Sequence, residues 1–253
     1  MTPDPLHVVL FLVLGAILGA LGGLFGIGGG LMAIPLLVVA FRLDEQHAQG
    51  TALVMVLPNV MIGLWNYAKR GGLDRKVALL LGACAVTFTF FGALFATRVA
   101  GPNLRYGFGA FLAVLAVLFA WQTLRRRDGA HARASLPWGY TGIVGALGGI
   151  LSGLFSVGGA VFAVSLLTTF FGYAQFAAQG LSLALVAPGT FAGIATYAQT
   201  GDVEWGIGIP LALGGTFSVR YGVALAHRLP ERTLRILFCI LLAGSAIALF
   251  ARV

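Results

Sequence analysis

The sequence is poor in charged residues. Of its 253 residues only 9% are Asp, Glu, Lys or Arg, whereas 59% are hydrophobic. A soluble domain carries about 25% charged residues, so a soluble fold would leave much of this apolar surface in water. The apolar stretches run to roughly 20 residues, the length of a membrane-spanning helix, and they lack the alternation of barrel strands. The sequence therefore predicts an all-α polytopic membrane protein.

Groups that support catalysis or bind metals are also scarce. The two cysteines, Cys84 and Cys239, lie in apolar stretches, and the four histidines are scattered, so neither type forms a disulfide or metal pattern. All acidic residues, Glu45 among them, are assigned to loops, to the linker between the two halves or to the chain start. This distribution argues against a carboxylate proton relay within the membrane. We expect no enzyme activity, no metal and no cofactor.

The net charge of +8 could indicate nucleic-acid binding, but nearly all Lys and Arg lie in short loops or at the ends of apolar stretches. Such a distribution is typical of residues that orient membrane helices, so we expect no nucleic-acid partner. The chain start, MTPDPLHVVLFLVLGAILGALGG, lacks the basic region of a signal peptide. It is interpreted as a retained membrane segment.

The second half of the chain repeats the first at an offset of 130 residues. The first repeat (1–124) is predicted to contain a glycine-broken hairpin over 8–41 and helices over 48–68, 77–97 and 104–124. A basic linker, 125–137, precedes the second repeat, 138–253. The matching residues include Gly23, Leu24 and Phe25 with Gly153, Leu154 and Phe155, Gln49 with Gln179, Pro58 with Pro188, and Tyr67 with Tyr197.

The loop charges predict that the two repeats have opposite orientations. The loop 69–76 and the linker each carry four Lys or Arg residues and are expected in the cytoplasm. The loop 199–205, the counterpart of 69–76, has two acids and no Lys or Arg, and is expected outside together with both chain ends. For the two repeats to have opposite orientations, each repeat must cross the membrane an odd number of times. A glycine hairpin that crosses fully and one that is re-entrant both satisfy this condition.

Glycine clusters interrupt the first apolar stretch of each repeat, in GLFGIGGGLMAIP (23–35) and GLFSVGGAVFAVS (153–165). Glycine makes non-helical backbone cheap, and opened backbone is tolerated in a membrane only where protein buries it or where it lines a wet cavity. Matched breaks in inverted repeats are typical of a transporter's central site, and helix N-termini beside them suit an anion. Close helix packing is the alternative, favoured for the upstream glycines of 15–23 and 145–153; such faces also allow a homodimer.

Several motifs together resemble the TauE/SafE family of sulfite exporters across nearly the whole chain. They are G-x-G-G-G-x-x-x-x-P (26–35), AQGTAL (48–53), its echo AAQGLSL (177–183) and GVALAHRLPERTLRILF (222–238). The resemblance implies a multi-pass permease of the bacterial inner membrane that carries small sulfur-containing anions. The second copy departs from the first at Ala160, Ser165 and Leu181, so the two half-sites are not equivalent.

Polar residues and glycines near the breaks are the candidate site. We expect an anion to bind near the midplane, where backbone N–H groups with amide and hydroxyl donors replace its water, and rocking of the repeats to alternate its access. The candidates are Gly26, Gly28, Gly29, Gln49, Thr51, Asn59, Ser156, Gly158, Gly159, Gln179 and Ser182.

Several polar residues have a structural alternative. Gln49 and Gln179 could cap helix starts, and Thr51 and Ser182 could bond to their own helices. Tyr67 and Tyr197 are assigned to interfacial aromatic belts, and Arg220 either serves the site or snorkels to the membrane surface.

The expected function is export of sulfite or a related sulfonate by a lipid-embedded permease. The alternatives are transport of another small anion, such as a carboxylate, and a non-transporting membrane scaffold. The latter explains the glycines as packing residues but not the matched breaks.

Overall fold

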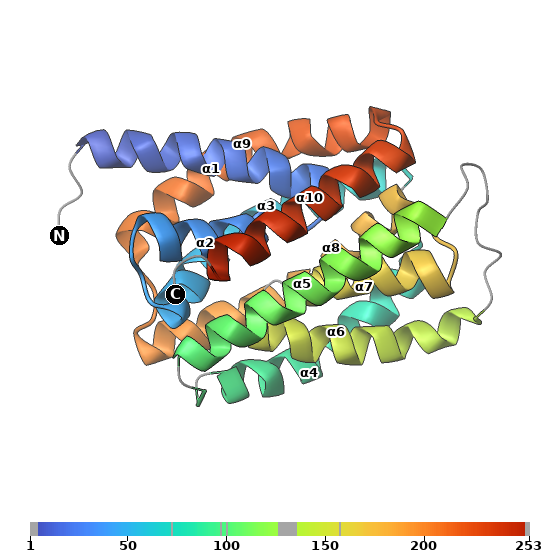
Figure 1. The fold of residues 1–253 in the computed structure, drawn as a ribbon, viewed down its shortest axis with the longest axis horizontal. Helices are drawn as coiled ribbons and strands as arrows, with labels where there is room; N and C mark the ends of the chain where they lie inside the picture. The colour runs from blue at the N-terminus through green and yellow to red at the C-terminus, as the bar shows by residue number, and fades with distance from the viewer. Residues whose placement is uncertain are drawn as a thin grey trace.

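The computed structural model describes residues 5–71, 73–96, 98–99, 101–125, 136–156 and 158–250, and these ranges are almost entirely α-helical (Figure 1). The prediction of an all-α protein is confirmed. Most of the predicted basic linker, 126–135, lies outside the described residues. The helices are α1 (Pro5–Phe25), α2 (Gly30–Ala40), α3 (Glu45–Lys69), α4 (Arg75–Ala96), α5 (Gly101–Arg125), a 3-10 turn (Trp138–Tyr140), α6 (Thr141–Phe155), α7 (Gly158–Phe170), α8 (Gln175–Thr200), α9 (Trp205–Arg228) and α10 (Glu231–Phe250).

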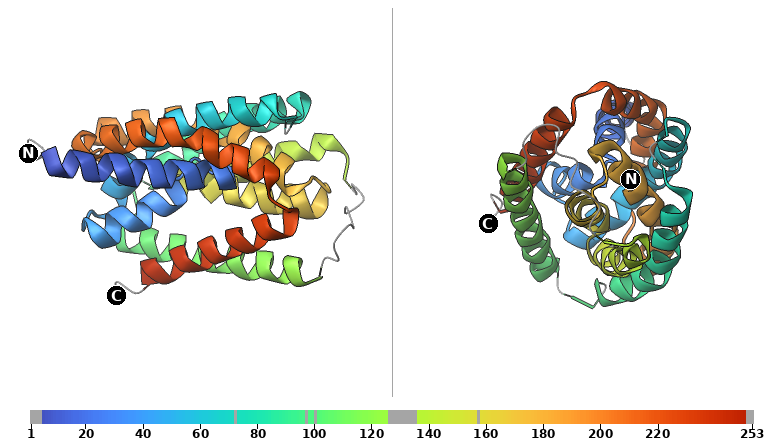
Figure 2. Two further views of the ribbon diagram at one scale, coloured as in Figure 1. Left: turned by 90° about the horizontal axis from the view of Figure 1, so that it is seen from above. Right: turned by 90° about the vertical axis from the view of Figure 1, so that its right-hand side faces the viewer.

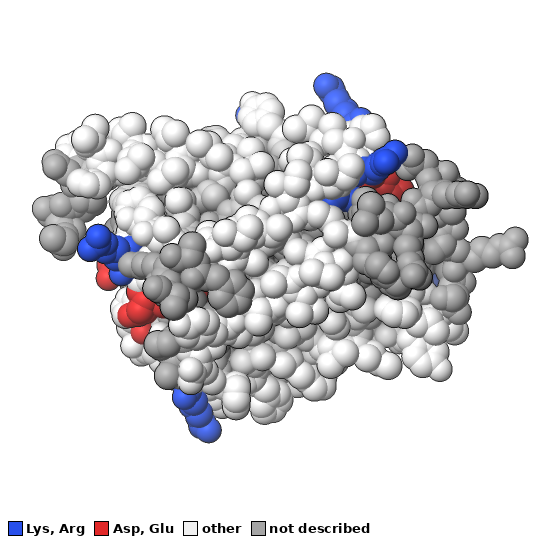
Figure 3. Space-filling model, viewed as in Figure 1, with Lys and Arg blue, Asp and Glu red and all other residues white. Residues whose placement is uncertain are grey.

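The outer surface of the bundle is suited to lipid. Within the described part of the chain, six helices are long and apolar enough to cross a membrane: α1, α3, α4, α6 with its 3-10 turn, α8 and α9. Large apolar side chains such as Phe95, Phe217 and Ile240 are exposed on the outside. Figure 3 shows that, on the face in view, charged residues gather at the two ends of the long axis and leave an uncharged band between them. These features indicate a multi-pass membrane protein.

The two ends of the bundle differ in charge. We call the end that contains Asp44, Asp202 and Glu204 the acidic end, and the opposite end the basic end. The start of α1 and the end of α10 lie towards the acidic end, whereas α5 ends and α6 begins at the basic end (Figures 1 and 2). The basic end carries Lys69, Arg70, Arg75, Lys76, Arg228, Arg232 and Arg235.

An electrostatic interaction between two loops supports this placement of the basic end. Burial and, second, the negative charge of Asp74 raise the pKa of Tyr173, which joins α7 to α8. The turn before α4 therefore lies close to the connection between α7 and α8.

The first glycine cluster forms a tight turn between α1 and α2. Gly26, Gly28 and Gly29 have φ values of +67°, +70° and +93°, in the left-handed region that glycine adopts readily. With 11 residues, α2 is about 16 Å long, only half of a bilayer's hydrocarbon thickness. The ring of Phe41, just past the end of α2, lies 5.0 Å from that of Phe11 in α1. The hairpin therefore turns inside the bundle and returns towards the end at which α1 starts.

Helix packing in the two repeats is reciprocal. Helix α1 packs against α9 and α6 packs against α4, while α3 lies against α8 and α5 against α10. A Cβ on Gly222 would lie 1.8 Å from the Ala20 carbonyl oxygen, and one on its counterpart Gly92 would lie 2.3 Å from that of Ile150. The upstream glycines also pack closely, since a Cβ on Gly15 would lie 2.2 Å from the carbonyl oxygen of Leu211. The packing role expected for them is confirmed.

Candidate functional site

Helices α3 and α8 lie side by side at the centre of the bundle and run in opposite directions. Along the pair, Leu53 Cδ1 lies close to Gly193 and Leu183 Cδ1 close to Gly63. This register places Pro58 and Pro188 at the same level, in the middle of both helices. At each end of the pair, a tyrosine of one repeat contacts a glutamine of the other.

The contact at the basic end involves four residues, which we call the Gln179 cluster: Gly26, Tyr67, Gln179 and Ser182. The Tyr67 hydroxyl lies 3.2 Å from Gln179 Oε1 and 2.9 Å from the Gly23 carbonyl oxygen. The Ser182 hydroxyl lies 2.9 Å from the Gly26 carbonyl oxygen and 2.8 Å from that of Gln179 in its own helix. A Cβ on Gly26 would lie 2.6 Å from Gln179 Cβ, so the glycine turn packs directly on the second turn of α8.

The contact at the acidic end involves Glu45, Gln49, Ser156 and Tyr197, which we call the Gln49 cluster. Gln49 Oε1 accepts hydrogen bonds from Tyr197 Oη at 2.8 Å and from Ser156 Oγ at 3.2 Å. Gln49 Nε2 donates to Glu45 Oε1 at 3.2 Å. Ser156, the counterpart of Gly26, has a φ of +59°, which is unusual for a residue with a side chain. Both ends of the Gln49 amide are therefore occupied by protein groups.

The two clusters differ in how well their amides are satisfied. Gln179 Nε2 is buried and has no hydrogen-bond partner among the described residues, and the same holds for both amide atoms of Gln175, one turn earlier. A buried polar group left unpaired costs about 1–3 kcal/mol. Such groups call for an explanation, and an intermittently bound ligand is one.

A smaller set of polar groups lies midway between the clusters. Asn59 Nδ2 donates to the Gly28 carbonyl oxygen at 3.2 Å, which ties the first glycine turn to the middle of α3. Asn59 Oδ1 and Thr89 Oγ1 are buried without a partner in the described part of the chain. The centre of the bundle thus has polar atoms beside the non-helical backbone of the first glycine turn.

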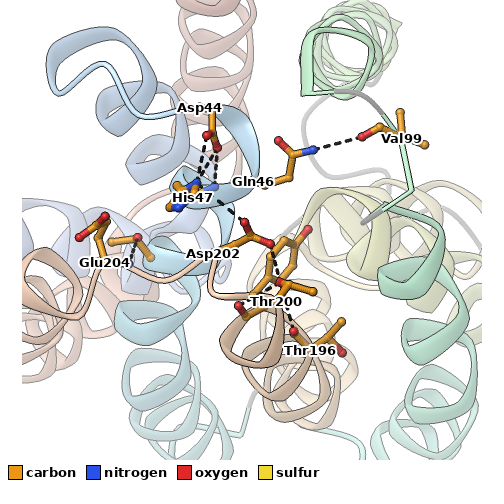
Figure 4. A network of polar contacts seen from close by, with 10 residues as sticks. Asp44, Gln46, His47, Val99, Thr196, Thr200, Asp202 and Glu204 are labelled. Carbon is orange, nitrogen blue, oxygen red and sulfur yellow. Dashed lines mark hydrogen bonds and ion pairs between the residues drawn. The ribbon is translucent and has the colours of Figure 1, made fainter.

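A polar network joins the start of α3 to the connection between α8 and α9 at the acidic end (Figure 4). The His47 amide donates to Asp44 Oδ1 at 2.9 Å, and the His47 ring lies 3.8 Å from Asp202 Oδ1. Gln46 Nε2 donates to the Val99 carbonyl oxygen at 3.1 Å. The connection between α8 and α9 packs directly on α3, because a Cβ on Gly50 would lie 2.1 Å from the Asp202 carbonyl oxygen. These contacts fix the start of α3 against the connection between α8 and α9.

Comparison with known proteins places these observations in a family. The family model described as "Sulfite exporter TauE/SafE" matches residues 11–249, nearly the whole chain. The chain belongs to the TauE/SafE family. It is 28% identical to a probable membrane transporter protein of Methanocaldococcus jannaschii, over 90% of each chain. It is also similar to the probable membrane transporter proteins YdhB and YunE of Bacillus subtilis, at 24% and 23% identity, over at least 90% of each chain. This TauE/SafE protein is therefore a membrane transporter.

The structure brings only some of the predicted site residues of this TauE/SafE protein together. Gly26, Gln179 and Ser182 form one cluster, and Gln49 and Ser156 belong to the other. Gln49 and Tyr67 lie about 27 Å apart along α3, from the rise per residue of an α-helix. Since Tyr67 contacts Gln179, the two glutamines are near opposite ends of the protein and do not meet in one midplane site.

The remaining candidates lie outside both clusters. Thr51 Oγ1 accepts a hydrogen bond from the Glu204 amide at 3.0 Å, at the acidic end. Gly29 and Gly159 are packing residues, because a Cβ would lie 2.7 Å from the Leu18 carbonyl oxygen in the first case and 1.9 Å from that of Gly148 in the second. Gly158 starts α7, and Gly28 bonds to Asn59 in the middle of the bundle.

Three assignments made from the sequence need correction or completion. Tyr67 and Tyr197 do not belong to interfacial belts, since both are fully buried and bond across the repeats. Glu45 is not a loop residue: it starts α3, is only 3% exposed and accepts from Gln49. Arg220 is exposed on the outside of α9, where it bonds to Tyr221, which favours snorkelling. Tyr67 and Tyr197 occupy equivalent positions in the two halves of the sequence, and this match could have identified them as candidate site residues.

We expect the Gln49→Leu substitution to destabilise the protein. It removes the acceptor of two buried hydroxyls, on Tyr197 and Ser156, together with the donor to Glu45. Unpaired buried groups cost about 1–3 kcal/mol each, so the free energy of unfolding should fall by at least about 2 kcal/mol. Thermal unfolding in detergent measures the change. Gln46→Leu, which removes one partly buried bond, is the matched control; equal losses in both variants would contradict the role of Gln49.

Proposed function

We propose that this protein is an inner-membrane permease that exports a small sulfur-containing anion, sulfite or a related sulfonate, by alternating access. The observation that carries the proposal is the pair of Tyr–Gln contacts between the repeats, one at each end of the antiparallel helices α3 and α8. Each contact adjoins a backbone turn, at Gly26 in one case and Ser156 in the other. A path along α3 and α8 would therefore meet one closure at each end.

The groups near this path suit an anion that must bind and leave. Amide and hydroxyl donors satisfy an oxyanion without holding it by a fixed charge. Helix α2 begins at Gly30 without a side-chain cap, and α7 begins at Gly158, so both present helix N-termini at the breaks. In the proposed mechanism the anion rests between the breaks, near Asn59, and the Gln49 and Gln179 clusters open in turn.

The reciprocal contacts support the division into two inverted repeats, 1–124 and 138–253. Every major helix pair has a counterpart under the repeat, including α1 with α9 and α6 with α4. With the basic end in the cytoplasm, as the positive-inside rule requires, the Gln179 cluster faces inwards. A negative-inside potential then favours export by about 2.3 kcal/mol per charge per 100 mV.

Flux measurements in proteoliposomes with a clamped membrane potential test this function. Sulfite, sulfate, thiosulfate and acetate are offered in parallel, with protein-free liposomes as the control. We expect sulfite flux that follows the potential. Flux of acetate without sulfite would indicate a carboxylate transporter, and no flux of any anion from folded protein would favour the scaffold.

A further inference from the structure

A pocket opens at the basic end, beside the first turn of α8. Its volume is about 250 Å³, and its lining includes Gln175, Phe176, His227, Leu229, Glu231 and Leu234. A water molecule occupies about 30 Å³ in the liquid, so a small oxyanion and several waters fit. The ring of His227 packs on that of Phe176 at 5.0 Å, which holds one wall in place.

One polar residue of the pocket lining is a fully buried glutamine whose amide has unused hydrogen-bonding capacity. Gln175 is fully buried, and neither its Nε2 nor its Oε1 has a hydrogen-bond partner among the described residues. One turn further along α8, on the same helix face, Gln179 Nε2 also has no partner in the part of the chain that the structure describes. Two amide donors therefore follow each other, about 6 Å apart along the helix axis, from the pocket to the Gln179 cluster.

A carboxylate from another helix sits at the N-terminus of α8. Ala174, the residue before α8, provides no side-chain cap. Instead Glu231 Oε1, from the first turn of α10, accepts a hydrogen bond from the Gln175 amide at 3.3 Å and pairs with Arg235. By contrast, α3 at the acidic end is capped by the adjacent Asp44.

The surroundings of Glu231 allow it to leave this position. Its side chain is 36% exposed, whereas that of Arg235 is 11% exposed. The carboxylate can turn towards water, whereas the Arg235 guanidinium, one turn further along α10, is largely buried and stays in place. Three groups would then be available to an oxyanion: the Arg235 guanidinium, the N-terminus of α8 and the buried Gln175 amide. All three types of group bind oxyanions.

We propose that this pocket is the entry site for the transported anion and that the Glu231 carboxylate occupies the position that a small oxyanion takes. The identity of the anion rests on the proposed function. In the resting state Glu231 fills the positive end of α8; the entering anion displaces it, pairs with Arg235 and the α8 amides, and then passes to Gln175 and Gln179. The resident carboxylate thus acts as a competitor that keeps the entry site selective for ions able to replace it.

Equilibrium dialysis of ³⁵S-labelled sulfite against the detergent-solubilised full chain tests the proposal. The apparent Kd equals the intrinsic Kd divided by the fraction of molecules whose site is free, so Glu231→Gln should lower the apparent Kd by about tenfold if the carboxylate fills the site nine-tenths of the time. Gln175→Leu should raise it about tenfold or more, because it removes a hydrogen bond to a charged ligand. Glu204→Gln, which removes an acid at the opposite end, is the control and should leave the Kd unchanged.

The possible results separate this proposal from the proposed function. Binding that both variants shift, without flux in proteoliposomes, would support the entry site and overturn the permease. Flux by the wild type with an apparent Kd that neither variant moves would overturn the entry site alone. If Glu231→Gln does not fold, Glu231→Ala takes its place. Absence of sulfite, sulfate, thiosulfate and acetate binding to folded wild-type protein would overturn the entry site.

Discussion

Replacing Gln179 with leucine should abolish most transport without lowering stability. The Gln179 Nε2 is buried and unpaired in the described structure, so the wild-type protein already bears the cost of desolvating it. The Tyr67 hydroxyl keeps an acceptor, the Gly23 carbonyl oxygen at 2.9 Å, when the amide is removed. Leucine has a similar volume and needs no partner, so the free energy of unfolding should stay the same or rise.

The transport rate of the Gln179→Leu variant, by contrast, should fall. A hydrogen bond to a charged ligand contributes about 1.5–3 kcal/mol, which corresponds to a loss of about tenfold to a hundredfold in the initial rate of flux. Initial rates in proteoliposomes and thermal unfolding in detergent give the two readouts. Thr196→Val is the matched control on the same helix, because the Thr196 hydroxyl donates to the Ala192 carbonyl oxygen one turn earlier in α8. A Gln179→Leu variant that transports normally would remove this residue from the path.

Gly26→Ala should impair both stability and transport. Gly26 has a φ of +67°, where alanine costs about 1–2 kcal/mol. The added Cβ would also lie 2.6 Å from Gln179 Cβ and 2.8 Å from its carbonyl oxygen, so the second turn of α8 must move. Overpacking adds about 1–3 kcal/mol, which gives a total loss of about 2–5 kcal/mol.

A second glycine separates backbone strain from the clash with Gln179. Gly71 has a φ of +75°, and a Cβ added there would meet no described residue within 4 Å, so Gly71→Ala introduces backbone strain without that clash. It should lose about 1–2 kcal/mol of unfolding free energy and keep its transport rate. Both variants are compared by thermal unfolding and by initial flux. Equal effects on flux would show that contact with α8 at Gly26 does not matter for transport.

The sequence predicted the helices better than it predicted the site. Hydropathy and the glycine breaks located the helices to within a few residues, because lipid imposes a strong and local constraint on composition. The partners of Gln49 could not be predicted, since Tyr197 and Ser156 come from the other repeat and their contact depends on how the helices pack. Glu45 was missed because a residue at the first turn of a helix reads as part of the loop before it.

The separation of the two glutamines has a geometric cause. In antiparallel helices related by a repeat, residues at the start of one helix lie opposite the end of its counterpart. Gln49 and Gln179 both lie in the second turn of their helices, near the start, and are therefore far apart, whereas mid-helix residues such as Pro58 and Pro188 fall at one level. Repeat-related residues converge only when they lie near the middle of such a pair.

This arrangement of α3 and α8 also constrains any path through the protein. Two straight helices that are in contact at their centres move in a coupled way: when they tilt apart at one end, they approach each other at the other end. With Pro58 and Pro188 at the crossing point and one Tyr–Gln contact near each end, such a tilt would widen the gap at Gln179 and narrow it at Gln49. A rigid tilt about that point would therefore exclude a continuous leak across the membrane by geometry alone, without a relay of side chains between the two ends.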